Sequence, residues 1–146
     1  GQLLWAAQGI TDPQGLRTAP SAGALYPLEL YVVAGNVEGL TPGVYHYQPD
    51  RHALQQTSTG DQRRLLAQAA HGQSWVRTAA AVVVITAVYT RTTGKYADRG
   101  VRYVHMEVGH AAQSLFLQAE ALGLAAVVVG AFEDAAVATA LGLATD

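Results

Sequence analysis

Residues 101–122 carry the longest regular pattern in the chain. Apolar side chains recur there at helical spacing, and Gly123 follows as a stop signal. The positions on this pattern are Val101, Val104, His105, Val108, Ala111, Ala112, Leu115, Ala119 and Leu122. At about 1.5 Å per residue, the predicted helix is roughly 33 Å long. One helix therefore crosses a whole domain, and the other elements must pack around it.

Strand patterns occur on both sides of this helix. Residues 28–34, 43–48 and 53–57 are rich in β-forming side chains and follow one another at hairpin spacing. They predict an antiparallel meander. Residues 79–89 predict a central strand that is apolar on both faces, and residues 125–131 predict a second buried strand.

Three shorter helices complete the predicted set of elements. They cover residues 3–7, which end before Gly9, residues 61–70 and residues 133–141. Residues 90–102, between the strand at 79–89 and the long helix, are a polar stretch. Because helices and hairpin-linked strands are mixed, we expect an α+β sandwich with helices packed on a mainly antiparallel sheet.

Composition excludes several classes of protein. Half of the 146 residues are hydrophobic and 14% are charged, so the chain can bury enough apolar surface to fold. The net charge is −2 and the basic residues are scattered, which argues against a nucleic-acid binder. The absence of cysteine excludes disulfides, thiolate metal sites and a cysteine nucleophile. The longest apolar stretches are shorter than the roughly 20 residues that span a bilayer. No leader pattern is visible, and we expect a soluble, cytoplasmic domain.

Two histidines on the long helix invite comparison with metal sites. His105 and His110 are five residues apart, whereas a metalloprotease helix needs a spacing of four to direct both at one metal. Glu107 and His110 form one Glu-x-x-His motif, but di-iron bundles require two. Polar groups that hydrogen-bond inside a buried helix explain these residues as well. No metal site is predicted.

Nucleotide and hydrolase motifs are missing from the sequence. No G-x-G-x-x-G follows a strand, and the segment around Lys95 lacks the glycine spacing and the Ser/Thr of a P-loop. Ser21 lies in Pro-Ser-Ala-Gly, which is not the nucleophile elbow of a serine hydrolase. The common dinucleotide-binding fold is therefore not predicted.

Residues 17–27, RTAPSAGALYP, combine proline, glycine and small side chains without a period. Such a loop lets the backbone approach a flat ligand closely, while Ser21 and free N–H groups can satisfy ring heteroatoms. An ordinary connection between a helix and a strand explains the same residues. The loop has few charges, so we expect it to pack against the domain.

Lys95 is the only lysine in the chain and is followed by Tyr96. Loops that follow strands are common places for catalytic groups. Both side chains have reference pKa values of roughly 10, so a role as a base near neutrality requires burial or nearby cations. Arg91, Arg99 and Arg102 could supply that positive charge. A solvated lysine on a loop is the alternative.

Several segments, in fixed order, resemble one known family. They are LLWAAQGIT, RTAPSAGALYPLELYVV, PGVYHYQP, RTTGKYADRGVRYVHMEVGHAAQSLFLQAEALGL and VVVGAFED. Together they resemble the SagB-type dehydrogenases, the azoline oxidase branch of the FMN-dependent nitroreductase superfamily. The resemblance covers essentially the whole chain.

This resemblance implies an FMN-binding α+β fold, an obligate homodimer, and oxidation of thiazolines or oxazolines in peptide natural products to azoles. The substrate would be a small molecule or a peptide, and other enzymes of a peptide-modifying pathway would be partners. It also implies that Lys95 and Tyr96 form the catalytic pair. The implied cofactor-binding residues are Pro20, Ser21, Ala22, Gly23, Gln73, Gly130 and Ala131.

The chain also departs from the family pattern. Relatives hold the FMN phosphate with an Arg-x-Ser segment before the first matched helix and a basic residue after a last strand. We therefore expect residues 1–146 to be a single domain that is truncated at both ends. Ser114 stands where many relatives have asparagine.

Two other functions stay open on the sequence alone. One is an NAD(P)H-dependent nitro or quinone reductase. The other is a non-catalytic dimerisation or scaffold domain of a peptide-modifying complex.

Overall fold

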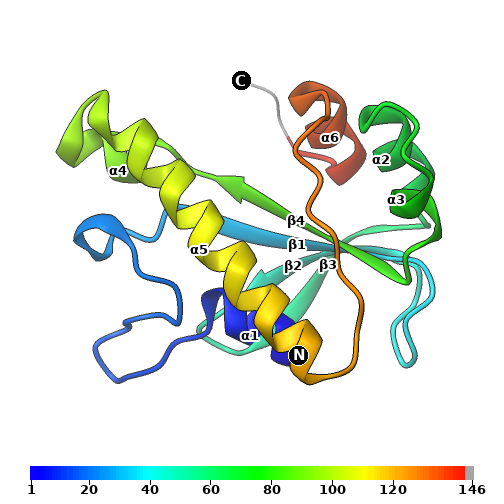
Figure 1. Cartoon of the computed structure of the whole chain (residues 1–146), viewed down its shortest axis with the longest axis horizontal. Helices are drawn as coiled ribbons and strands as arrows, with labels where there is room; N and C mark the ends of the chain where they lie inside the picture. The colour runs from blue at the N-terminus through cyan, green and yellow to red at the C-terminus, as the bar shows by residue number, and fades with distance from the viewer. Residues whose placement is uncertain (144–146) are drawn as a thin grey trace. The chain divides into compact units, whose positions relative to one another are not determined.

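The computed structural model describes residues 1–143 and has an α+β fold (Figure 1). The predicted fold class is confirmed. The last three residues of the expected domain, 144–146, lie outside the described residues. The elements in chain order are α1 (Gln2–Gln8), η1 (Ala22–Ala24), β1 (Leu28–Ala34), β2 (Gly43–Gln48), β3 (Ala53–Thr59), α2 (Arg63–Ala69), α3 (Ser74–Thr78), β4 (Ala81–Ala87), α4 (Thr90–Tyr96), α5 (Arg99–Ala121) and α6 (Asp134–Leu141).

The four strands form one sheet in the order β3-β2-β1-β4. β1 and β2 are antiparallel, with Tyr31 opposite His46 and Ala34 opposite Gly43. The predicted meander is therefore confirmed, and β1 and β2 have the predicted bounds. The alternation of β-branched and aromatic side chains is what allowed these strands to be predicted from the sequence.

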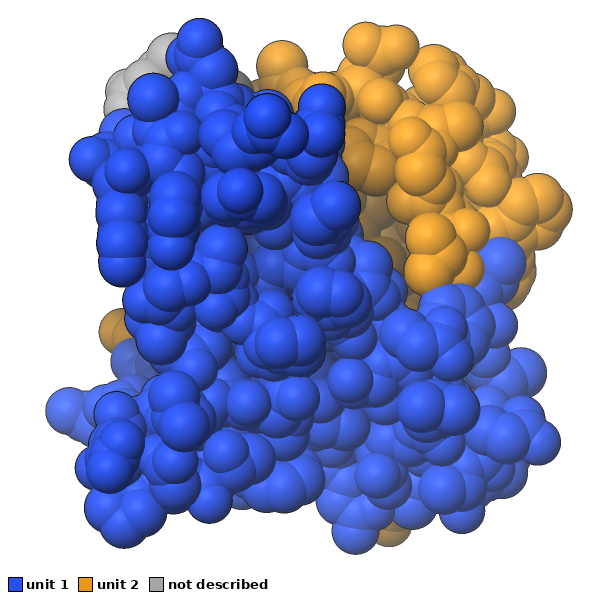
Figure 2. Space-filling model, turned by 60° about the vertical axis from the view of Figure 1, so that its left-hand side comes forward, with its two compact units in different colours: residues 1–30, 47–53, 85–127 blue, residues 31–46, 54–84, 128–146 orange. Residues whose placement is uncertain are grey.

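The chain divides into two compact units (Figure 2). Unit 1 comprises Gly1–Leu30, Tyr47–Ala53 and Ile85–Val127, and unit 2 comprises Tyr31–His46, Leu54–Val84 and Val128–Asp146. In unit 1, α1 and α4 both pack against the long helix α5. Gly100 permits the close approach of α4, because a Cβ there would lie 2.9 Å from the Thr93 backbone.

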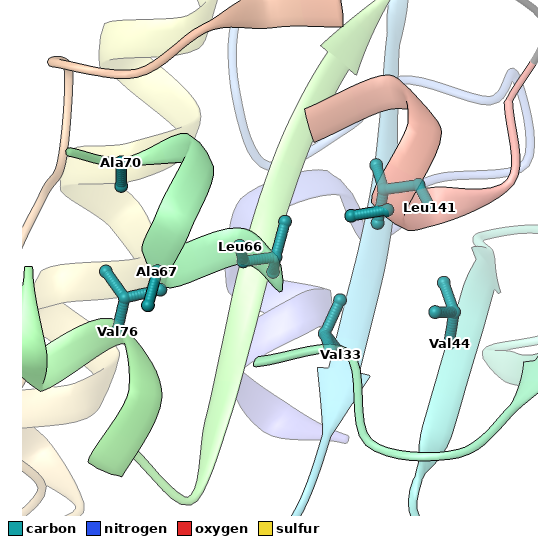
Figure 3. Close-up of a cluster of buried hydrophobic side chains, with 8 residues drawn as sticks. Val33, Val44, Leu66, Ala67, Ala70, Val76 and Leu141 are labelled. Atoms are coloured by element: carbon teal, nitrogen blue, oxygen red, sulfur yellow. The ribbon is translucent and has the colours of Figure 1, made fainter. Parts of the chain in front are cut away.

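Unit 2 has a core in which small residues on the helices allow close packing (Figure 3). Its buried members are Val33, Val44, Leu66, Ala67, Ala70, Val76, Ala140 and Leu141. Burial of one leucine or valine side chain stabilises a fold by about 1.5–3 kcal/mol. This cluster therefore holds α2, α3 and α6 on β1 and β2.

The helix predicted at residues 101–122 is confirmed as α5. Val104 and Ala111 on its apolar face are fully buried. None of the helices described in residues 1–143 is both long and apolar enough to cross a membrane.

The strand predicted at residues 125–131 is wrong. These residues form neither helix nor strand, and Val127 and Val128 are 64% and 61% exposed. A continuous apolar run cannot by itself tell a strand from another apolar segment. A strand also needs a neighbour for its backbone groups, and no strand within residues 1–143 pairs with this segment.

The position predicted for residues 79–89 is also wrong. β4 lies at one end of the strand order, so it is an edge strand of the described sheet and not a central one. Its side chains are only partly buried. The apolar run predicted a strand correctly, but its place in the sheet depends on pairing that the run does not encode.

Residues 90–102, expected as a polar stretch ahead of the long helix, hold a helix instead. α4 covers Thr90–Tyr96, and Thr92 within it is fully buried. Packing of α4 on α5 overrides the weak helix propensity of a segment with three threonines and a glycine. The short helix α3 was also not predicted.

Candidate functional site

The loop formed by residues 17–27 is held at both ends within unit 1. The Arg17 backbone N–H donates to the Tyr26 hydroxyl at 3.1 Å, and the Arg17 guanidinium lies 4.7 Å from the centre of the Tyr26 ring. The same guanidinium donates to Gln8 Oε1 at 2.7 Å. Burial lowers the pKa of Arg17, although Glu29 opposes this effect. Arg17 thus clamps the two ends of the loop together.

The loop backbone adopts an unusual conformation between these ends. Gly23 has a φ of +63°, and Ala24 and Tyr26 are left-handed at +53° and +45°. Such angles are unfavourable for residues other than glycine and persist only where the surroundings hold them. One restraint is the Ser21 hydroxyl oxygen, which accepts the Tyr26 N–H at 3.0 Å. The loop also contacts Gln8 and α5, so it packs against the rest of unit 1 as sequence analysis expected.

A shallow hollow of about 230 Å³ lies between this loop and α5. It is lined by Pro20, Ser21, Ala22, Tyr103, Met106, Glu107 and His110. Sites that enclose a whole drug-sized ligand measure roughly 300–1,000 Å³. The hollow therefore fits part of a ligand of cofactor size.

Glu107 is the buried charged group at this hollow. It is 2% exposed, and its Oε1 has no hydrogen-bond partner among the described residues. Burial raises the pKa of Glu107, while a hydrogen bond with the Ser21 hydroxyl and the charges of Arg17 and His110 oppose that shift. His110 Nδ1 lies 3.4 Å from the Pro20 carbonyl oxygen. Two residues of α5 therefore contact the loop.

Sequence analysis missed the role of Glu107 beside the loop. The signal was present, because Glu107 shares the buried stripe of α5 with Val104 and Ala111 at spacings of three and four. A carboxyl on such a stripe requires a partner.

Lys95 and Tyr96 lie in the last turn of α4 and meet the loop at Gly23. A Cβ added at Gly23 would lie 2.8 Å from the Tyr96 hydroxyl oxygen and 3.1 Å from Lys95 Nζ. The Tyr96 ring packs edge to face on Tyr103, with 5.1 Å between centroids. The structure therefore brings the predicted residues Gly23, Lys95 and Tyr96 together.

Arg91 is one of the three cations expected to support Lys95. Its Nη1 lies 2.7 Å from a Glu29 carboxylate oxygen and donates to the Tyr26 carbonyl at 3.1 Å. Arg91 is therefore paired with a carboxylate, and it anchors the end of the loop.

The remaining predicted cofactor-binding residues belong to unit 2. Gln73 precedes α3, and its Nε2 donates to the Ala131 carbonyl oxygen at 3.2 Å. Gly130 and Ala131 are exposed, and a Cβ added at Gly130 would meet no atom within 4 Å. The structure therefore joins Gln73 to Ala131 and leaves open space beside Gly130.

The chemistry of both groups fits a flat heteroaromatic ring such as that of FMN. In unit 1, residues 20–23 carry small side chains beside the hollow, and a Cβ at Gly23 would fill the space next to Tyr96. In unit 2, the Gln73 amide retains further hydrogen-bonding capacity, since one N–H accounts for its bond to Ala131. Small side chains, backbone N–H groups and amides are the kinds of group that orient a ring in a binding site.

Comparison with known proteins identifies the family. A model of the nitroreductase family matches residues 1–146. The chain belongs to the nitroreductase family. Members of this family typically bind FMN.

Three relatives illustrate the match. A family protein of Methanocaldococcus jannaschii is 51% identical over 132 residues, which are 90% of this chain and 67% of that protein. The microcin B17-processing protein McbC of Escherichia coli is 32% identical over 97% of this chain and 54% of its own length. A solved family structure from Anabaena variabilis superposes with a TM-score of 0.91 at 32% identity, over 98% of this chain and 31% of that one.

The E. coli microcin synthetase McbBCD complex, solved with truncated pro-MccB17 bound, also contains a matching chain. The TM-score is 0.82 at 31% identity, over 98% of this chain and 56% of that one. Residues 1–146 thus span between 31% and 67% of the length of these relatives.

Proposed function

We propose that the protein containing this chain is an FMN-dependent dehydrogenase that converts azoline rings of peptide natural products to azoles. The observation that carries the proposal is the placement of Lys95 Nζ and the Tyr96 hydroxyl against Gly23 of the loop. Similarity to McbC, a microcin-processing protein, supports a peptide substrate. A homodimer that works with other peptide-modifying enzymes is part of the same proposal.

Aromatisation of an azoline removes two hydrogens from adjacent ring atoms, one as a hydride and one as a proton. FMN, when bound, supplies the hydride acceptor. The chain must therefore supply a group that takes the proton. We assign that role to the Lys95–Tyr96 pair, in which the proton passes to the member that is deprotonated when the substrate reacts, because Lys95 Nζ and the Tyr96 hydroxyl both reach the loop at one point.

The residues proposed to contact the cofactor are those with small or amide side chains. Pro20, Ser21, Ala22 and Gly23 would face its ring from the loop of unit 1. Gln73, Gly130 and Ala131 remain predicted contacts in unit 2.

The test compares Lys95→Ala and Tyr96→Phe with the wild type in the full-length protein. We expect each variant to retain the flavin absorbance and to lose at least about 100-fold in azoline turnover, the usual contribution of a positioned acid or base. Arg64→Ala, an exposed cation on α2, serves as the control and should turn over normally. Full turnover by Lys95→Ala would contradict the assignment.

A second candidate is an NAD(P)H-dependent nitro or quinone reductase. The 51% identity to the M. jannaschii family protein favours it. Anaerobic stopped-flow measurements separate the two candidates, because only a reductase is reduced faster by NAD(P)H than by an azoline substrate. Full-length protein that purifies without flavin would favour a scaffold role.

A further inference from the structure

Two consecutive carbonyl groups at the end of the loop bond to the start of α4. The Tyr26 carbonyl oxygen accepts from Arg91 Nη1 at 3.1 Å, and the Pro27 carbonyl oxygen accepts from the Val88 backbone N–H at 2.8 Å. Val88 lies two residues before α4, and Arg91 is the second residue of that helix. Tyr26 itself has a left-handed φ of +45°. The strained end of the loop is therefore joined directly to the start of α4.

Glu29 of β1 holds Arg91 in place at this joint. Nη1 of the guanidinium carries two N–H groups, so it serves the Tyr26 carbonyl and also lies 2.7 Å from the Glu29 carboxylate. The arginine side chain is 42% exposed and the glutamate side chain 22%. Ion pairs that solvent reaches in this way contribute little to the free energy of unfolding. The main consequence of the contact is therefore geometric, because it fixes how the loop lies against α4.

Arg91 and Lys95 are four positions apart on α4. Side chains at this spacing project from the same face of a helix, and both of these meet the loop. Lys95 Nζ and the Tyr96 hydroxyl reach it at Gly23, three residues before Tyr26. Packing on α5 holds α4 itself but does not determine where the loop lies on the helix. A loop released from Arg91 would therefore move the surface that Lys95 and Tyr96 contact.

We propose that Arg91 is a positioning residue whose bonds to the Tyr26 carbonyl and to Glu29 hold the loop against the last turn of α4, where the proposed catalytic pair lies. This role is distinct from the positive charge that the sequence led us to expect of Arg91, because the Glu29 carboxylate compensates that charge at 2.7 Å. Its consequence for turnover rests on the proposed function. The holding itself does not, and it can be measured without flavin or substrate.

The first measurement is a double-mutant cycle on urea unfolding of the full-length protein. Gly23→Ala places a methyl against the Tyr96 hydroxyl and Lys95 Nζ, which is unfavourable as long as the loop is held on α4. Arg91→Met removes the hydrogen-bond donors at similar length and lets the loop yield. We expect the factor by which Gly23→Ala raises the unfolding equilibrium constant to be at least about 3-fold smaller in Arg91→Met than in the wild type.

Gly15→Ala is the matched control for this cycle. Gly15 also has a positive φ, +84°, but a Cβ there would meet no atom within 4 Å. The factor for Gly15→Ala should therefore be the same with and without Arg91. Arg64→Met, the same substitution at an exposed position of α2, should leave the factor for Gly23→Ala unchanged.

The second measurement is amide hydrogen exchange at Val88, whose N–H bonds to the carbonyl next to the one that Arg91 contacts. Since the neighbouring hydrogen bond is lost, we expect exchange at Val88 to be about 5-fold faster in Arg91→Met. Arg64→Met should not change it.

The third measurement is turnover, in which a displaced loop should affect the chemical step rather than substrate binding. We expect Arg91→Met to retain the flavin absorbance, to lose about 10-fold in kcat per bound flavin, and to keep the KM for the azoline within about 2-fold. A residue needed only for stability would not change kcat per bound flavin.

An equal factor for Gly23→Ala with and without Arg91, or unchanged exchange at Val88, would overturn the positioning role whatever the activity. Wild-type kcat in Arg91→Met, in a protein that oxidises azolines, would overturn it as well. If Arg91→Met does not fold, Arg91→Gln, which is shorter and uncharged, replaces it in the same cycle. A protein that cannot oxidise azolines, but whose cycle shows unequal factors, would refute the proposed function and support the positioning role.

Discussion

Gly23 has a φ of +63°, and it is also the point at which the loop meets Lys95 and Tyr96. Gly23 must therefore meet two requirements, one on its backbone angle and one on the space beside its Cα. The backbone angle is unfavourable for any side chain, and a Cβ would have to displace the Tyr96 hydroxyl and Lys95 Nζ.

Gly23→Ala separates these two demands when it is compared with Gly15→Ala. Gly15 has a φ of +84°, but a Cβ there would meet no atom within 4 Å. Both variants should lose about 1–2 kcal/mol of unfolding free energy to the backbone angle. Only Gly23→Ala should also impair azoline turnover, because its methyl displaces Lys95 and Tyr96. Urea unfolding and turnover assays measure the two effects, and equal turnover in both variants would contradict the described contact.

Glu107 and Asp61 should respond to pH in opposite directions. Burial raises the pKa of Glu107, so the folded state binds its proton more tightly than the unfolded state does. The free energy of unfolding therefore falls as pH rises from the ordinary carboxyl pKa through the raised one. Hydrogen bonds from Arg63 lower the pKa of Asp61, so its contribution is present above the ordinary pKa and is lost as pH falls through the lowered one.

Urea unfolding at a series of pH values tests these signs. Glu107→Gln should remove the loss of stability above the ordinary carboxyl range, and Asp61→Asn should reduce the loss in acid. The Asp61 effect should be small, because that side chain is 39% exposed. A Glu107→Gln profile that parallels the wild type would show that the carboxyl is not buried in the folded protein.

Single residues differ in how far the sequence predicts their place. Lys95 and Gly23 could be selected in advance because the segments that carry them resemble the SagB-type dehydrogenases, whereas residue type and spacing alone left a solvated lysine and an ordinary loop open. The contact between them could not be predicted, because it depends on helix α4, whose threonines and glycine do not indicate a helix. Glu107 was visible as a carboxyl on a buried helix stripe, but its place with Ser21 at the hollow joins residues 86 positions apart, and no local pattern encodes that.

At the level of elements, the packing of α4 on α5 depends on Gly100. Gly100→Ala should destabilise the protein even though alanine favours helices, because its Cβ would lie 2.9 Å from the Thr93 backbone. Gly109→Ala on the same helix meets no atom within 4 Å and should stabilise by about 0.5–1 kcal/mol. Thermal unfolding of both variants checks the contrast. The same sign of change in both would contradict close packing of α4.

Elements with a clear period were predicted well. The meander and the helix α5 each repeat their apolar positions often enough to fix type and approximate bounds. The predictions for α4 and for residues 125–131 failed for opposite reasons. α4 is a polar helix whose existence depends on its neighbour, and residues 125–131 are apolar without a strand beside them in the described part of the chain.

At the level of the whole chain, large apolar side chains remain exposed in both units. Val127 and Val128 are, with Leu117, the most exposed of them among the described residues. In residues 1–146 prepared alone, Val127→Thr combined with Val128→Thr should lower the fluorescence of a hydrophobic dye and change the unfolding free energy by less than about 0.5 kcal/mol. A large loss of stability would instead show that these valines are buried, as a strand at 125–131 would require.

The clamp between Arg17 and Tyr26 also bears on how such a chain can diverge. It closes a loop of eight intervening residues at its ends, so these two contacts offset part of the entropy cost of loop closure whatever residues lie between them. Residues inside the clamp that lack the Ser21 and Gly23 contacts are then free to vary without unfolding the loop. Substitutions between Arg17 and Tyr26, in evolution or by engineering, can therefore change ligand preference while the fold is retained.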